Sequence, residues 1–80
     1  MLEELREKSR VAGVKQTRRA ILEGNVRRVF LARDADPRVT GPIEALCAER
    51  GIPVEQVPSM RELGTACGIA VGSAAAAIFA

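Results

Sequence analysis

An unbroken apolar run, Val29 to Ala32, constrains the fold more than any other stretch of this chain. Successive side chains of a strand point to opposite faces of its sheet, so a strand with one face in water alternates polar and apolar residues. This run does not alternate, which indicates a strand that is covered on both faces. We therefore expect residues 26–32 to lie inside a sheet with helices on each side.

The residues before this strand predict a helix, a strand and a second helix. Residues 2–10 are rich in helix formers and have two leucines on one face. Residues 10–13 can form a short strand that ends at a glycine. A helix is expected from about Lys15 to Glu23, because the Gly24-Asn25 pair that follows is typical of a helix end.

Turn chemistry marks the start of the next helix. Asp36 and Pro37 fit an N-cap followed by proline at the first helical position. The helical pattern is clearest from Pro42 to Arg50, and the glycine after it ends the helix. Residues 52–57 predict a short strand, whose proline indicates an edge strand or the start of a strand.

The last part of the chain predicts one more helix and one more strand. Ser59 and Glu62 form a capping-box pattern at the start of a helix over residues 59–68. Alanine favours helix in residues 73–80, but the segment is short and apolar, and the alternation of elements favours a strand. The pattern predicts a single α/β domain over residues 1–80, a three-layer α/β/α sandwich around a small mixed, mostly parallel sheet with right-handed crossovers.

Composition excludes several classes of protein. The chain has no histidine, which excludes Ser-His-Asp and Cys-His catalysis and nearly all zinc sites. Phe30 and Phe79 are its aromatic residues, so the core is built from aliphatic side chains, and no aromatic platform for stacking bases is available. Cys47 and Cys67 lie in apolar surroundings and predict buried, reduced thiols. The sequence shows no signal-peptide core and no apolar run of roughly 20 residues, so we expect a cytoplasmic protein that does not cross a membrane. We also expect a monomer without catalytic residues, metal or cofactor.

Positive charge is concentrated in the first part of the chain. Residues 1–33 hold nine Lys and Arg against four Glu, whereas residues 34–80 hold three Arg against six acidic residues. Such asymmetry is typical of a protein with one surface that faces a polyanion. The alternative is a solvated surface whose charges cluster only in the sequence.

The stretch GVKQTRRAI, residues 13–21, places cations at the start of a helix. Backbone N–H groups are unpaired there and the helix dipole is positive, so each cation is unfavourable by about 0.3–1 kcal/mol unless an anion is present. Lys15, Arg18 and Arg19 can hold phosphates, and Gln16 can both donate to and accept from a base edge. The stretch predicts a nucleic-acid contact, with a solvated helix face as the alternative.

Two other stretches can carry chemistry. The apolar segment GIAVG, residues 68–72, indicates either a buried turn or a loop exposed for a partner. In an exposed loop, Ile69 and Val71 can pack against an unstacked base. Asp34 and Asp36 can hold Mg²⁺ or act as a carboxylate pair, but helix capping and turn formation explain them better, because no other catalytic group accompanies them.

The stretches GVKQTRRAI, RDADP and IPVEQVPSMRELGTACGIAVGSAAAAI together resemble the L7Ae/L30e ribosomal protein family, especially its bacterial YbxF-like branch. The resemblance covers about the whole chain and keeps the order and spacing of the segments. It implies binding to kink-turn RNA, a sharply bent helix–bulge–helix motif with tandem sheared G·A pairs. It also implies that the helix after the first strand enters the groove beside those pairs, while the later loop packs against the bulged nucleotides. The implied RNA-binding residues are Gly13, Lys15, Gln16, Thr17, Arg18, Arg19, Gly68, Ile69, Ala70 and Val71.

The chain departs from this family at two positions. Thr65 stands where the family usually has lysine after E-L-G, and Ala70 where it often has glutamate, whereas Gln16 follows the bacterial branch. The resemblance implies an RNA-binding module associated with ribosomal RNA, with riboswitch or other regulatory RNA, or with the ribosome. A protein-interaction adaptor on the same fold is the alternative, and salt-dependent RNA binding distinguishes the two.

Overall fold

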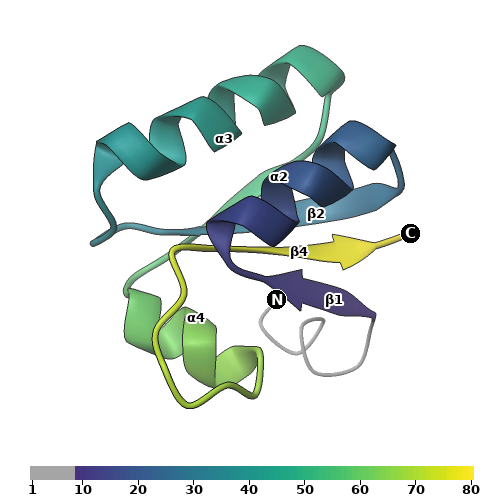
Figure 1. Cartoon of the computed structure of the whole chain (residues 1–80). Coiled ribbons are helices and arrows are strands. Elements are labelled where there is room, and N and C mark those ends of the chain that lie inside the picture. The colour runs from purple at the N-terminus through teal and green to yellow at the C-terminus, as the bar shows by residue number, and fades with distance from the viewer. Residues whose placement is uncertain (1–8) are drawn as a thin grey trace.

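The structure, a computed structural model, describes residues 9–80, which form a four-stranded sheet and three helices (Figure 1). The strands are β1 (Arg10–Ala12), β2 (Val26–Ala32), β3 (Val54–Val57) and β4 (Ala75–Phe79), and the helices are α2 (Val14–Glu23), α3 (Pro37–Arg50) and α4 (Met60–Ala66). The helix expected over residues 2–10 falls outside the described residues, except that Arg10 belongs to β1. The predicted elements from β1 to β4 are confirmed, including the final alanine-rich strand.

The sheet is mixed, with the strand order β1-β4-β2-β3. β2 and β3 are parallel, whereas β4 lies between β1 and β2 and is antiparallel to both. The prediction of a mixed sheet is therefore confirmed. The prediction that the sheet is mostly parallel is wrong, because two of the three strand pairings among the described residues are antiparallel. The reason lies after α4, where the chain returns to the start of that helix: the N–H of Ser73 donates to the carbonyl oxygen of Met60 at 3.0 Å. Because the chain returns there, β4 starts at the end of the sheet where β2 and β3 finish, and it therefore runs antiparallel to them.

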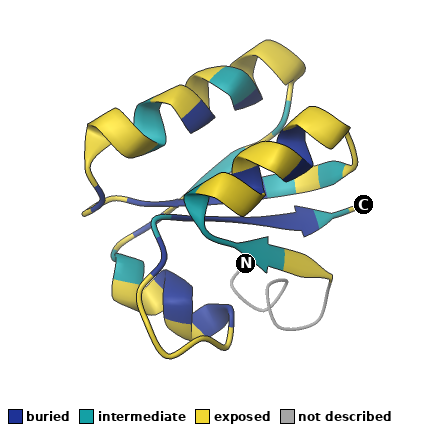
Figure 2. Ribbon diagram, viewed as in Figure 1, coloured by how far each residue is buried: buried dark blue, intermediate teal, exposed yellow. Residues whose placement is uncertain are grey.

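Helices cover both faces of the sheet, which confirms the three-layer prediction. α2 and α3 lie on one face and α4 on the other (Figure 1). Val29 and Leu31 of β2 belong to the core on the α2 and α3 side, whereas Phe30 belongs to the core on the α4 side. β4 is buried along nearly its whole length (Figure 2). Its alanines are small, so helices can approach the sheet closely from both sides.

The ends of the helices follow local chemistry. The side chain of Asp36 accepts a hydrogen bond from the N–H of Arg38 at 2.9 Å and caps α3, as predicted. α3 continues through Pro42, although a proline ring disfavours the helical conformation of the residue before it. That residue is Gly41, which has no Cβ to meet the ring, so the helix runs unbroken to Arg50.

Both cysteines are free and buried, as predicted. Cys47 belongs to the core between the sheet and the α2 and α3 helices, and Cys67 to the core under α4, so the sheet separates the two thiols. Burial raises the pKa of both thiols above the ordinary value of 9.0. At neutral pH the thiols are therefore protonated and unreactive.

Candidate nucleic-acid interface

One end of the sheet brings together the two stretches that the sequence predicts to bind RNA. α2 starts directly after β1, and the loop 68–74 leads into β4. Ala12 of β1 pairs with Ala76 of β4, so the next residue, Gly13, lies beside Ala75. The N–H of Gly13 donates to the carbonyl oxygen of Ala75 at 2.8 Å. The start of α2 and the apolar loop are therefore neighbours, although they lie at opposite ends of the sequence.

The start of α2 is open to an anion. Gly13 is the N-cap and has a φ of 102°, in the left-handed region that favours glycine. No side chain caps this helix among the described residues, and its first turn has no acidic residue. A Cβ on Gly13 would lie 2.7 Å from Oε1 of Gln16, so the Gln16 amide lies over the helix start. Unpaired N–H groups, Lys15 and this amide together form a surface suited to phosphate and base edges.

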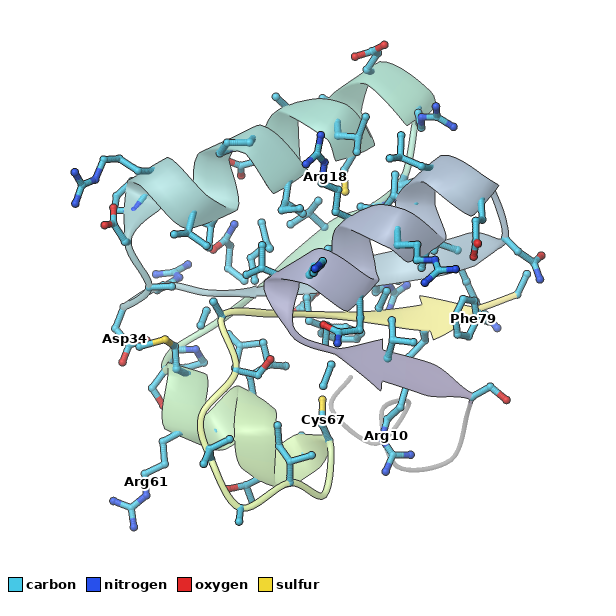
Figure 3. The ribbon with its side chains drawn as sticks, in the orientation of Figure 1. Arg10, Arg18, Asp34, Arg61, Cys67 and Phe79 are labelled. Atoms are coloured by element: carbon cyan, nitrogen blue, oxygen red, sulfur yellow. The ribbon has the colours of Figure 1, made fainter. Side chains whose placement is uncertain are left out.

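The cations of α2 are exposed to solvent, and Arg18 also lines a groove between α2 and α3. Lys15, Arg18 and Arg19 are exposed, and Arg18 is labelled in Figure 3. Nε of Arg19 lies 3.6 Å from Oε2 of Glu23, a solvent-exposed pair that contributes little to stability. Lys15 and Arg18 form no ion pair with any residue between 9 and 80. Their charges are therefore available to an external anion.

Thr17 differs from its neighbours in α2. Its side chain is fully buried, on the helix face that also buries Ala20 and Ile21. Its hydroxyl oxygen has no hydrogen-bond partner within the described part of the chain. The side chain of Thr17 therefore packs beneath the helix and does not belong to the outer surface that Lys15 and Gln16 form.

The apolar loop is exposed and is not a buried turn. Gly68, Ile69, Ala70 and Val71 all lie at the surface. The side chain of Ile69 is 39% exposed and that of Val71 is 71% exposed. The structure thus decides between the two alternatives for this segment: two branched apolar side chains are presented to solvent in a loop whose later residue Ser73 contacts the start of α2.

Two residues that the sequence analysis did not assign to the site hold this loop in place. Gly64 is buried in α4, and a Cβ there would overlap the carbonyl oxygen of Val71 and lie 3.0 Å from the Cα of Gly72. A glycine inside a helix costs about 1 kcal/mol relative to alanine, which is a signal of such close packing. Ser73 is buried, and its Oγ accepts from the N–H of Gly13 at 3.2 Å and donates to the Ala75 carbonyl oxygen at 2.7 Å. No sequence pattern singles out Ser73.

The two aspartates serve helix starts. Hydrogen bonds from the Arg38 side chain, and then from its backbone N–H, hold the pKa of Asp36 below its usual value. Oδ1 of Asp34 accepts a hydrogen bond from the N–H of Met60, the first residue of α4, at 2.7 Å. Within residues 9–80, no group of three His, Cys, Asp or Glu is arranged to hold a metal ion. No helix in this part of the chain is long and apolar enough to cross a membrane.

A known protein family matches almost the whole chain. The ribosomal protein L7Ae/L30e/S12e/Gadd45 family matches residues 2–80. The chain is 47% identical over 68 residues to the RNA-binding protein YbxF of Geobacillus stearothermophilus. These aligned residues make up 85% of this chain and 83% of that protein. The chain is 45% identical over 69 residues to the large ribosomal subunit protein eL8 of Halobacterium salinarum. That alignment spans 85% of this chain and 58% of the eL8 protein.

A solved structure has the same fold. The Giardia lamblia 15.5kD RNA binding protein superposes with a TM-score of 0.87 and 24% identity, covering 99% of this chain and 67% of that one. The names of these three proteins refer to RNA binding or to the ribosome. Because the match spans residues 2–80, the chain belongs to the ribosomal protein L7Ae/L30e/S12e/Gadd45 family.

Proposed function

We propose that the protein binds RNA and that its target is a kink-turn. One observation carries the proposal: a hydrogen bond from Gly13 to Ser73 joins a helix start with free cations to the end of a loop in which Ile69 and Val71 are exposed. A plain duplex offers phosphates but no unstacked bases. A bulge next to a helix offers both within a short distance, which matches the two halves of this surface.

Each half of the surface has a chemical role in this proposal. Lys15 and the N–H groups of the first turn of α2 hold phosphates, and Arg18 and Arg19 add positive charge. Gln16 lies over the helix start, from where its amide can read a base edge in the groove. Ile69 and Val71 pack against bulged bases, which favour apolar contacts once they leave the stack. Phosphate contacts orient the RNA, and base contacts select it.

The cellular target in this proposal is ribosomal or regulatory RNA in the cytoplasm. The family match and the relatives named as RNA-binding or ribosomal proteins support it. The whole surface lies within one small domain, so we expect the protein to bind its RNA as a monomer.

Equilibrium binding to a kink-turn RNA and to a plain duplex of equal length tests the proposal. We expect tighter binding to the kink-turn at every salt concentration. For each phosphate contacted, log K falls by about 0.7–0.9 for each unit of log salt. Equal affinity for the two RNAs would remove the specificity claim, and binding to neither would leave the protein-interaction adaptor as the better description.

Two matched variants separate orientation of the RNA from reading of its bases. Gln16→Ala should reduce the preference for intact G·A pairs by about 1–3 kcal/mol, because it removes a base-edge contact. Lys15→Ala should weaken binding to intact and mutant RNA alike and reduce the salt slope by about 1. If Gln16→Ala leaves the ratio of the two affinities unchanged, Gln16 does not read a base.

A further inference from the structure

A side chain from a distant strand binds the backbone at the end of α4. Nε and Nη2 of Arg10 lie 3.0 and 2.9 Å from the carbonyl oxygen of Cys67, and both donate to it. Figure 3 shows Arg10 near the end of α4 that carries Cys67. Arg10 belongs to β1, an edge strand, and is separated from Cys67 by 57 residues. Hydrogen bonds from a charged donor are stronger than neutral ones, so these two bonds hold the Cys67 carbonyl group against β1.

The bound carbonyl belongs to the turn from which the apolar loop starts. The N–H of Gly68 donates to the Thr65 carbonyl oxygen at 3.0 Å, and the N–H of Ile69 to that of Gly64 at 3.1 Å. With a φ of 77° at Gly68, these bonds form a Schellman motif. The motif leaves the Cys67 carbonyl without a partner in the helix, and Arg10 provides one. A Cβ on Gly68 would lie 3.3 Å from Nη2 of Arg10, so the guanidinium also covers this glycine.

The other end of the loop is tied to the same strand. Ser73 accepts a hydrogen bond from the N–H of Gly13, the residue after β1 and the N-cap of α2. β1 therefore holds the loop at both ends, through the side chain of Arg10 at one end and through Gly13 at the other. The exposed side chains of Ile69 and Val71 lie between these two anchors.

We propose that Arg10 is a positioning residue for RNA binding, which rests on the function proposed above. Through the Cys67 carbonyl, Arg10 sets the spacing between the apolar loop and the start of α2, so that one RNA can contact both. Without it, the loop samples conformations in which Ile69 and Val71 are displaced from the helix start. The apparent association constant is then multiplied by the fraction of molecules that keep the competent conformation.

The test compares Arg10→Met with Arg27→Met. Methionine keeps an unbranched apolar stem but removes the donors of Arg10. Arg27 is an exposed arginine near Gly51 and Pro53, so its variant loses the same charge away from the loop. If the competent fraction falls to about one tenth, Arg10→Met lowers the affinity for kink-turn RNA about tenfold. Arg10→Lys, which keeps one charged donor, should recover part of this loss, whereas Arg27→Met should change the affinity little.

Two further measurements distinguish positioning from other roles of Arg10. Amide exchange should become faster in residues 68–72 and stay unchanged in β2, whereas a residue that only stabilises the fold would alter both. The slope of log K against log salt should stay the same. A decrease of about 0.7–0.9 in that slope would mean that Arg10 binds a phosphate directly, and would overturn the positioning role. An unchanged affinity for kink-turn RNA would also overturn it.

A double-variant cycle tests whether Arg10 acts through the loop. Val71→Ser should weaken RNA binding less in Arg10→Met than in the wild type, because the displaced loop has already lost the contact. Additive effects would show that Arg10 and the loop act independently. If the wild type itself does not prefer kink-turn RNA, the proposed function fails. A normal preference that Arg10→Met leaves intact overturns only the role of Arg10.

Discussion

Adjacent residues at the start of α2 have opposite environments, because each residue of a helix is rotated by about 100° from the one before it. Lys15, Gln16 and Arg18 face solvent, whereas Thr17 faces the sheet and is fully buried. Thr17 also leaves its hydroxyl oxygen without a partner among the described residues. A buried polar group without a hydrogen bond is destabilising by about 1–3 kcal/mol.

Thr17→Val should therefore stabilise the protein by about 1 kcal/mol, since it replaces the unpaired hydroxyl by a methyl group of similar size. The kink-turn affinity should not change, because the side chain lies beneath the helix. Thermal and urea unfolding measure the stability. Thr17→Ser, which keeps the hydroxyl and loses the methyl group, should be less stable than the wild type by about 1 kcal/mol. A large loss of RNA affinity in Thr17→Val would mean that the hydroxyl group reaches the RNA.

At the scale of elements, α4 and the loop that follows it form one unit. Gly64 allows the loop backbone to lie directly on α4, and Ser73 and Arg10 tie its two ends to β1. Ser59 caps the start of the helix by accepting a hydrogen bond from the N–H of Glu62 at 3.1 Å, as the capping-box pattern predicts. A short helix is stable here because these contacts support both of its ends.

Gly64→Ala should destabilise the protein, although alanine is the better helix former. The added methyl group overlaps the Val71 carbonyl oxygen, and the cost of overpacking, about 1–3 kcal/mol, exceeds the gain in helix propensity of about 1 kcal/mol. The loop should shift and RNA affinity should fall. Thr65→Ala is the control, because it improves helix propensity at the next, exposed position and adds no atom. If Gly64→Ala proves as stable as Thr65→Ala, the loop does not pack against α4 as described.

On the scale of the whole molecule, the sheet divides the interior into two separate cores with one thiol in each. Burial, and then the charge of Glu44, raises the pKa of Cys47 above its ordinary value of 9.0. In the unfolded chain this thiol ionises near the ordinary value, so folding favours the neutral form. The resulting contribution to stability is complete below the unfolded pKa and is lost as the pH rises above it.

The wild type should therefore lose more stability than Cys47→Ala between about pH 8 and about pH 10. At neutral pH the variant should be less stable, because it leaves a small cavity in the core. As the pH rises, the difference in Tm between the two proteins should shrink. Thermal unfolding in a reducing buffer measures both curves. Parallel curves across this range would show that the Cys47 thiol titrates alike in the folded and unfolded chains.

Local chemistry explains why much of this protein could be predicted from its sequence. The caps at Asp36 and Ser59, the glycine after each of α2 and α3, and the apolar run of β2 act through residues close in the sequence. Each of these patterns therefore determines its own element. The order of the motifs also identified the family, since motif order and spacing are properties of the sequence itself.

The sequence by itself determined the elements, the three-layer class, the cationic start of α2 and the family. Only the tertiary structure decided that β4 lies antiparallel between β1 and β2, that residues 68–71 are exposed, and that Thr17 is buried. It alone brought Arg10 to the Cys67 carbonyl and Ser73 to Gly13. These bonds join residues 57 and 60 positions apart, and no local pattern encodes such a separation. They form because the loop after α4 returns the chain to the end of the sheet where α2 begins.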